Sequence, residues 1–131
     1  MKLRIHGNSI RLRLNRREVA QFTANASLEE AMEWGTGPGD RLVYRLEASE
    51  SALDVGVRVN GWAIAIIVPA VLAQTWASTD RVEIAANVRL NAGKSLSILI
   101  EKEFRRLHGA NNDPDLYPNP LESGFAQKHH R

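Results

Sequence analysis

The chain contains no cysteine among its 131 residues, which excludes disulfide scaffolds, thiolate zinc sites and cysteine nucleophiles. Its longest apolar run covers residues 62–73 and is far too short to span a bilayer. The N-terminus alternates charged and apolar residues and lacks the apolar core of a signal peptide. We therefore expect a cytoplasmic protein that makes no membrane contact.

Motifs for catalysis or metal binding are absent as well. Four histidines are present, and no pair of them has the helical spacing of metal ligands with a carboxylate alongside: His6, His108, His129 and His130. Serine and histidine form no nucleophile signature, and the glycines of residues 35–39 lack the context and the lysine of a phosphate loop. Glu30 lies at an inward parity, where we expect an ion pair with a basic neighbour. The sequence thus predicts neither an enzyme nor a metal or cofactor site.

Acidic side chains are missing from residues 1–17, which hold six lysines and arginines. The whole chain has a net charge of only +2, with 24% charged and 44% hydrophobic residues, as in one soluble globular domain. A basic patch on a near-neutral protein is typical of a nucleic-acid contact. It is equally typical of a solvated strand face whose positive side chains discourage edge pairing.

Apolar and polar residues alternate through residues 2–14 on both sides of Gly7-Asn8. A period of two predicts strands, and a Gly-Asn pair between them predicts a tight hairpin. One face of this hairpin is apolar and the opposite face is almost entirely basic. The basic face carries Lys2, Arg4, His6, Ser9, Arg11 and Arg13.

A short helix follows the hairpin, because Asn15 and Glu18 have the spacing of a capping box. Two further strands are predicted at residues 28–34 and 41–47, with a glycine-rich loop between them. The same order of elements then recurs in the second half. It comprises strands at 55–59 and 62–68 around an Asn-Gly turn, a helix at 71–76, and strands at 80–90 and 96–104.

The two units superimpose at a constant offset of 54 residues without a gap. Matched pairs include Gly7 with Gly61, Phe22 with Trp76, Leu28 with Val82, Glu29 with Glu83, and Glu47 with Glu101. An internal repeat predicts that neither half buries its apolar face alone. The alternative is that two αβ units are similar by coincidence.

These patterns divide the chain into a domain and a tail. We expect residues 1–104 to form a single domain made of two repeats, about 2–48 and 56–102. Residues 105–131 are rich in turn formers and lack periodicity, which predicts an extended or disordered tail. Within it, Leu116 and Tyr117 are candidate anchors for a partner, or they pack back on the domain.

The basic hairpin with its capped helix resembles the start of the AbrB/MazE/SpoVT swapped-hairpin family, which opens with a basic strand, a Gly-Asn-Ser turn and an alternating strand. In the second half, Val68-Pro69 is similar to the helix entry of that family, and residues 80–83 are similar to the segment that starts its third strand. The resemblance covers about residues 2–102 and implies two interlocked ββαββ copies. One chain with both copies would be a fused pseudo-dimer, monomeric or weakly self-associating. The whole chain also resembles small bacterial proteins without an assigned activity.

The family's best-known members bind DNA, and some are antitoxins whose tails wrap a toxin. Carried over by position, the resemblance implies DNA contacts from Arg4, Asn8, Ser9 and Arg13, with Lys2 and Arg11 close by. Arginine suits this role because it binds phosphates and guanine edges with two hydrogen bonds.

The second hairpin departs from this pattern. It keeps an arginine, Arg58, at the position of Arg4. At the positions of Asn8, Ser9, Arg11 and Arg13 it carries Trp62, Ala63, Ala65 and Ile67. Its outer face has therefore lost its charge, and such a face is often covered by a tail, another copy or a partner. We expect the three tryptophans to pack in the core, with Trp62 as the possible exception because it lies beside the turn.

The sequence thus predicts a mainly β, α+β fold in which two ββαββ repeats form one swapped-hairpin-type β-barrel with two short helices. Two functions remain open. One is a protein-interaction module that kept the fold and lost DNA binding; the other is a DNA-binding regulator or antitoxin-like protein that uses the basic hairpin. Acidic side chains of Glu29, Glu33 or Glu47 closing around that hairpin would favour the first. The predicted partner is an unknown protein or DNA.

Overall fold

The computed structural model describes residues 1–105 and 113–119. The first half contains β1 (Lys2–His6), β2 (Ser9–Leu14), α1 (Arg16–Asn25), β3 (Ser27–Glu33) and β4 (Arg41–Ser49). The second half contains β5 (Gly56–Asn60), β6 (Ala63–Pro69), α2 (Ala70–Ser78), β7 (Glu83–Arg89), the short 3₁₀ turn η1 (Asn91–Gly93) and β8 (Ser95–Lys102). No helix in these ranges is long and apolar enough to cross a membrane.

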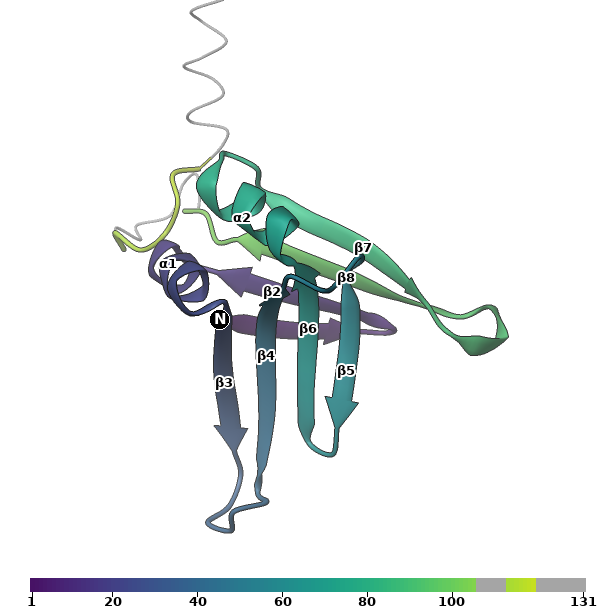
Figure 1. The fold of residues 1–131 in the computed structure, drawn as a ribbon. Helices are drawn as coiled ribbons and strands as arrows, with labels where there is room; N and C mark the ends of the chain where they lie inside the picture. Colours follow the sequence, from purple (N-terminus) through teal and green to yellow (C-terminus); the bar gives the residue numbers. More distant parts are fainter. Residues whose placement is uncertain (106–112, 120–131) are drawn as a thin grey trace, which may run out of the picture.

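The strands form two four-stranded sheets that exchange hairpins between the halves of the chain. Sheet A has the order β1-β2-β8-β7 and sheet B the order β3-β4-β6-β5. Each sheet thus joins a hairpin of the first half to a hairpin of the second, and the strands of one sheet run across those of the other (Figure 1). The predicted mainly β, α+β fold with two short helices is confirmed.

The predicted closure into a β-barrel is wrong for the described residues. Sheet A keeps β1 and β7 as edge strands, and sheet B keeps β3 and β5. A barrel needs a continuous ring of strand pairing, whereas here the two sheets only pack face to face. The hairpin exchange ties them together without hydrogen bonds between the sheets' edges.

Strand register is the same in the centre of both sheets. In sheet A, β2 and β8 run parallel and Leu12 lies opposite Ile100. In sheet B, β4 and β6 run parallel and Leu46 lies opposite Ile66. Leu12 and Ile66 differ by 54 residues, and so do Leu46 and Ile100. The pair in sheet A therefore corresponds to the pair in sheet B when the two halves of the chain are exchanged. The first hairpins obey the same rule, because Lys2 pairs with Arg13 and Gly56 with Ile67.

The constant offset of 54 fails at one strand. Leu28 of β3 lies opposite Leu46, and the counterpart of Leu46, Ile100, lies opposite Ile84. Leu28 therefore corresponds to Ile84, two residues beyond the predicted Val82, and Glu29 corresponds to Ala85 instead of Glu83. The connection before β7 is longer than the one before β3, and the loop that follows β7 (residues 90–94) is two residues shorter than residues 34–40.

The core lies between the two sheets and under the two helices. Its fully buried side chains come from both sheets and from α2: Leu12, Leu14, Leu46, Ile66, Val68, Trp76, Ile84 and Ile100. The helices meet through Phe22 and Trp76, whose rings pack edge to face with centroids 6.4 Å apart. Neither half could bury these side chains alone, because every sheet contains strands of both.

The two helices begin differently. Asn15 accepts a hydrogen bond from the Glu18 backbone, and the Glu18 side chain accepts one from the Asn15 backbone, so the predicted capping box is present. Helix α2 begins after Pro69 and has no side-chain cap. Pro69 suits this place because it has no backbone N–H to satisfy.

Candidate functional site

The outer face of sheet A, which points away from sheet B, gathers the residues predicted for the basic hairpin. Antiparallel pairing places Lys2 opposite Arg13, Arg4 opposite Arg11, and His6 opposite Ser9. Directly opposed residues share a face of the sheet, so the predicted basic face is present. Asn8 lies in the turn, where its amide donates to the Ser95 carbonyl at 2.6 Å and ties the hairpin to β8.

Carboxylates from β8 and the segment after it neutralise much of this face. Glu101 accepts a hydrogen bond from Arg13 Nε at 2.9 Å and lies 3.7 Å from Arg11 Nε. Glu103 forms an ion pair with Lys2. The acids that pair with the basic side chains of this hairpin are therefore Glu101 and Glu103. Glu29, Glu33 and Glu47 lie in sheet B.

Beside these ion pairs, the outer face of sheet A is hollowed. Arg4, His6, Ser9 and Arg11 line a hollow of about 250 Å³. An adjoining trough of about 480 Å³ extends across β2, β8 and β7, where small side chains such as Ala85 leave space. Among the described residues, Arg4 has no ion-pair partner. A cation beside a hollow is chemically suited to an anionic group such as a phosphate.

The outer face of sheet B differs from the expected apolar surface. Ala65 is only 6% exposed, and its cross-strand neighbours are Arg45 and Arg58. Both arginines extend to Glu47 and donate hydrogen bonds of 2.7 Å to it. Ala63 and Ile67 are half-buried in the same face. The expectation failed because Arg45 of β4 and Arg58 of β5 reach over the apolar residues of β6, so this face is charged although β6 itself carries no charge.

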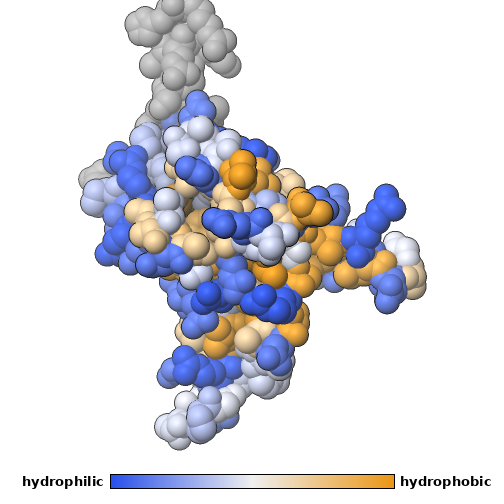
Figure 2. All heavy atoms as spheres, in the orientation of Figure 1, coloured by the Kyte–Doolittle hydropathy of each residue, from blue (hydrophilic) through white to orange (hydrophobic). Residues whose placement is uncertain are grey.

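Figure 2 views this outer face and shows a band of hydrophilic side chains across sheet B, with hydrophobic surface on both sides of the band. Burial by itself raises the pKa of Glu47, but the hydrogen bonds and charges of Arg45 and Arg58 lower it below its usual value overall. The carboxylate therefore stays ionised, and the three side chains close over Ala65.

Two tryptophans lie exposed at the far end of sheet B, on the face opposite to this network. Trp34 is 51% and Trp62 67% exposed, and their rings contact each other edge to face with centroids 5.6 Å apart. Strand register places Met32 and Val59, both exposed, on the same face. We call Met32, Trp34, Val59 and Trp62 the distal patch. Only Trp76 is in the core as predicted.

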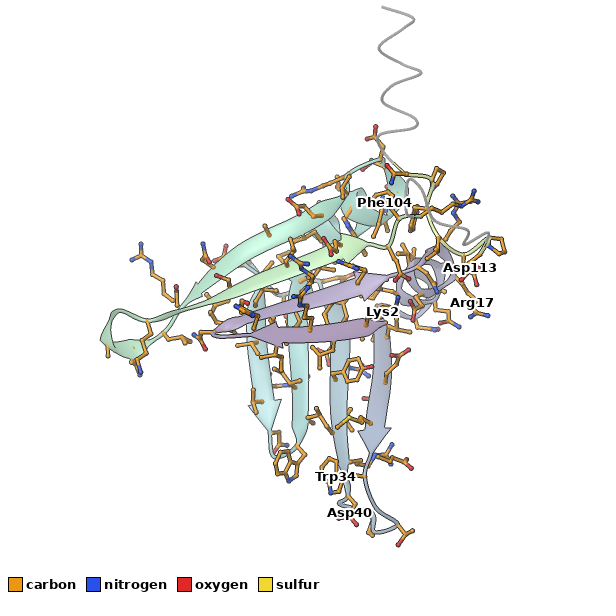
Figure 3. The ribbon with its side chains drawn as sticks, turned by 180° about the vertical axis from the view of Figure 1, so that it is seen from behind. Lys2, Arg17, Trp34, Asp40, Phe104 and Asp113 are labelled. Atoms are coloured by element: carbon orange, nitrogen blue, oxygen red, sulfur yellow. The ribbon has the colours of Figure 1, made fainter. Side chains whose placement is uncertain are left out.

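The distal patch exists because sheet B extends beyond the area that sheet A covers. In Figure 3 the lower half of sheet B extends beyond sheet A and is not covered by it, and Trp34 and Asp40 lie near the end of this part. The residues on the inner face of sheet B are apolar except for Glu30 and the hydroxyl group of Tyr44, so the part that sheet A covers belongs to the core and the uncovered part is exposed. The alternation of apolar and polar residues is the same in both parts, so the sequence could not show which apolar residues are buried and which are exposed.

The described part of the tail, residues 113–119, packs on the domain. Leu116 is 6% exposed, and Tyr117 bonds through its backbone to Glu103 and Arg105. The Asp115 carbonyl accepts a hydrogen bond from the Arg16 backbone at the start of α1. The two predicted anchors thus contact the chain's own domain. Residues 106–112 and 120–131, which the tail prediction also includes, lie outside the described residues.

A lysine is buried where this segment meets the domain. Lys102 is 5% exposed, and its ammonium group donates to the Thr79 carbonyl at 2.7 Å. The same group lies 5.8 Å from the ring centroid of Trp76 and 5.4 Å from that of Tyr117. Burial lowers the pKa of Lys102, although the charge of Asp80 partly offsets the effect. Burial also disfavours the charged form of Tyr117, and for this acidic group it raises the pKa.

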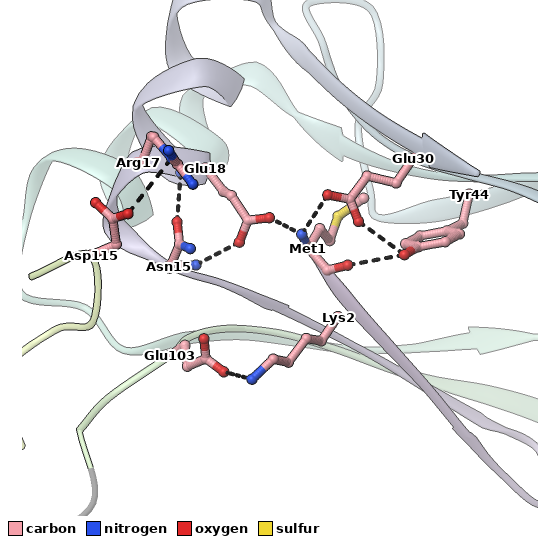
Figure 4. Close-up of polar contacts among 9 residues, drawn as sticks. All are labelled: Met1, Lys2, Asn15, Arg17, Glu18, Glu30, Tyr44, Glu103 and Asp115. Atoms are coloured by element: carbon pink, nitrogen blue, oxygen red, sulfur yellow. Dashed lines mark hydrogen bonds and ion pairs between the residues drawn. The ribbon is translucent and has the colours of Figure 1, made fainter. Parts of the chain in front are cut away.

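A second polar cluster surrounds the first residue of the chain (Figure 4). The Met1 ammonium group forms ion pairs with Glu18 and Glu30. Tyr44 donates to the other carboxylate oxygen of Glu30 at 2.9 Å. Burial and the Glu30 carboxylate raise the pKa of Tyr44 to about 12. Glu30 thus pairs with a cation as expected, but the cation is the chain's own amine.

Residues suited to a metal ion do not gather in the described ranges. No group of three or more histidine, aspartate or glutamate side chains could hold one there. His6 lies on the outer face of sheet A, while His108, His129 and His130 are outside the described residues.

The fold and these surfaces define a mainly β protein with exchanged hairpins, whose notable surface features are a hollowed, partly neutralised face and an apolar patch. By comparison with known families, the chain belongs to DUF7009, a family of unknown function whose model matches residues 1–121. No curated protein and no solved structure matches the chain.

Proposed function

We propose that this protein is a protein-interaction module that binds its partner through the distal patch. The observation that carries the proposal is the exposure of Trp34 and Trp62 side by side. Exposed aromatic side chains in a cluster are typical of the energetic centre of a protein–protein interface. Met32 and Val59 enlarge the apolar surface around them.

Charge around the distal patch supports a protein partner over a nucleic acid. Arg41 beside it already pairs with Glu33, at 3.9 Å. A nucleic-acid platform combines stacking aromatics with a basic groove, and here the rings contact each other edge to face. Such a pair offers apolar edges to a partner, not two parallel stacking surfaces.

We further propose that the chain is a fused, two-repeat relative of the swapped-hairpin family that its first hairpin resembles. The exchanged hairpins and the equal registers of the two sheets support this proposal. In this interpretation the second copy kept Arg58, the counterpart of Arg4, but lost those of Arg11 and Arg13, and the fold was reused for interaction.

Site-specific photo-cross-linking tests the interaction function. A benzophenone amino acid replaces Trp62 in the full chain, which is expressed in its own organism and irradiated. We expect one discrete adduct with another protein, and we expect Trp34→Ala in the same chain to weaken it. The matched control carries the photoreactive residue at Leu53, which is 91% exposed in the connection between β4 and β5.

Three results would contradict the proposal. These are equal adducts from both positions, no adduct from position 62, or an adduct with the mass of two copies of this chain. Far-UV circular dichroism of the Trp34→Ala variant checks that the fold is unchanged.

DNA binding is the second candidate function, and one observation favours it. Arg4, which has no ion pair among the described residues, lines a hollow with His6, Ser9 and Arg11. Against it, Glu101 and Glu103 hold Lys2, Arg11 and Arg13, which are the other cations of the same hairpin. DNA affinity depends on cations that are free to replace counterions at phosphates.

Fluorescence anisotropy with duplex DNA across a salt series tests this second function. Arg4→Ala should reduce the slope of log affinity against log salt by about one, whereas Arg58→Ala on sheet B should leave it unchanged. Glu101→Gln should strengthen binding, because it frees Arg11 and Arg13. Absence of binding at low salt, where electrostatic attraction is strongest, would exclude the function.

A further inference from the structure

The buried Lys102 has a counterpart position in the other half of the molecule. In sheet A, Lys102 lies opposite Leu14, and in sheet B, Ala48 lies opposite Val68. The members of each corresponding pair differ by 54 residues. Ala48 therefore occupies the place of Lys102, and it lacks the four-carbon stem and the ammonium group.

The aromatic residue beside this position is also matched. Trp76 of α2 lies beneath the Lys102 ammonium group, and Phe22 of α1 corresponds to Trp76. Both rings are buried, and they contact each other between the helices. Each half thus places one aromatic ring beside the equivalent position, but this position is a lysine in one half and an alanine in the other.

A pocket is present where the lysine is missing. It has a volume of about 250 Å³. Its lining consists of Phe22, Thr23, Ala26, Ala48, Ala70, Ala73 and Gln74. Four of these side chains are alanines, so the space is not filled from either helix. A linear side chain of lysine length fits this volume, since the equivalent space holds one.

The pocket also offers a partner for a positive charge. Thr79, whose carbonyl receives the Lys102 ammonium group, comes three residues after Trp76. Asn25 comes three residues after Phe22 and is the last residue of α1. The last carbonyls of a helix carry partial negative charge, and the last turn of α1 contains no basic residue. The Ala26 carbonyl, which follows Asn25 and belongs to a lining residue, accepts one hydrogen bond from the Ala48 backbone at 2.9 Å. A carbonyl oxygen has two lone pairs, so it can accept a second donor.

We propose that this pocket, between the end of α1 and the start of α2, binds a lysine side chain presented by a protein partner. The stem lies against Phe22, Ala48 and Ala73, and the ammonium group contacts the carbonyl end of α1. Lys102 makes the equivalent contacts within the chain itself, and this is why we infer a lysine side chain as the ligand. The pocket is separate from the distal patch, so the proposal adds a second contact and rests only on the protein-interaction function.

Amide chemical shifts of the full, ¹⁵N-labelled chain test the pocket. The probe is the blocked tripeptide acetyl-Gly-Lys-Gly-amide, and the control is the same peptide with norleucine, which keeps the stem and loses the ammonium group. We expect saturable shifts at Thr23, Ala26 and Ala73 with the lysine peptide. Norleucine should bind about tenfold more weakly, because it cannot donate a charged hydrogen bond.

Variants that fill or sharpen the pocket complete the test. Ala48→Lys should abolish peptide binding, because it places a lysine where Lys102 lies in the other half. Ala20→Lys, exposed on α1, is the matched control with the same added charge. Ala48→Leu fills the pocket without charge and should also abolish binding, which keeps the test valid if the lysine variant does not fold.

Ala26→Asp should raise the affinity for the lysine peptide several-fold. It adds a carboxylate at the end of α1, as Asp80 follows α2. Ala26 has a φ of 57°, a conformation that aspartate adopts more readily than alanine, so the fold is not expected to suffer.

Equal affinity for the two peptides, or unchanged binding in Ala48→Lys, would overturn the proposal. So would a shift of residues 120–131 on Ala48→Lys, because the chain's own tail would then be the occupant. None of these measurements involves Trp34 or Trp62. Failure here is therefore distinguishable from failure of the cross-linking experiment.

Discussion

Glutamates occupy the same place on the outer faces of the two sheets, but different strands supply their arginine partners. Glu101 of sheet A corresponds to Glu47 of sheet B at the offset of 54. Glu101 is approached by two arginines of β2, Arg11 and Arg13. The arginines of Glu47 come from β4 and β5 instead.

The strand that supplies these arginines determines which hairpin keeps an arginine without an ion pair in the described part of the chain. Arg58, which binds Glu47, corresponds to Arg4 in sheet A. Arg4 has no ion pair among the described residues, because Arg11 and Arg13 already occupy its glutamate. One framework thus gives a face closed by ion pairs on sheet B and a face with an available cation on sheet A.

Truncation of the two matched aromatic residues should give the largest effects. Phe22→Ala and Trp76→Ala each remove a buried ring and should lower the free energy of unfolding by about 3–5 kcal/mol. Trp76→Ala should cost more, because it also loses the hydrogen bond to the Val82 carbonyl and the contact with Lys102. Urea unfolding followed by far-UV circular dichroism measures both. A larger loss in Phe22→Ala would show that the halves do not share their core as described.

Neutralising the two matched glutamates should give a smaller and unequal loss. Glu47→Gln weakens two charged hydrogen bonds over a buried alanine and should cost about 1–2 kcal/mol, allowing for the partial exposure of the arginines. Glu101→Gln weakens one hydrogen bond and one longer ion pair and should cost about 1 kcal/mol or less. The same unfolding assay at neutral pH compares them. Equal losses would mean that the strand origin of the arginines has no energetic consequence.

Acid titration should sharpen the same comparison. The net lowering of the Glu47 pKa means that the folded state favours its ionised form. Its stabilisation is therefore complete above the unfolded pKa, near 4.5, and is lost as the pH falls through the folded value. Unfolding free energies measured from pH 6 to pH 3 should fall less steeply in Glu47→Gln than in the wild type. A parallel pH profile for the variant would exclude this role of Glu47.

Much of the fold follows from local patterns in the sequence. Alternation located the hairpin turns at Gly7 and Gly61, whose φ angles of 54° and 60° suit glycine. Asn15 and Glu18 marked the start of α1 correctly. Such features depend on neighbours in the chain, so the sequence carries them directly.

Features that depend on how the sheets pack could not be predicted in this way. Trp34 has the alternation of a core residue, but sheet A does not reach it. Ala65 has the alternation of a surface residue, but Arg45 and Arg58 close over it from neighbouring strands. The register shift at Ile84 depends on loop lengths, which a gap-free comparison of the halves hides.

The smallest effects should come from the matched arginines. Arg58→Ala loses its hydrogen bond to Glu47 and should cost about 0.2–1 kcal/mol, as exposed ion pairs do. Arg4→Ala breaks no ion pair within the described residues and should leave the free energy of unfolding unchanged within error. The contrast should disappear in a Glu47→Gln background, because Arg58 then has no carboxylate to bind. A cost for Arg4→Ala equal to that of Arg58→Ala would show that Arg4 contacts an acid in solution, and the first hairpin would then offer no free cation to a ligand.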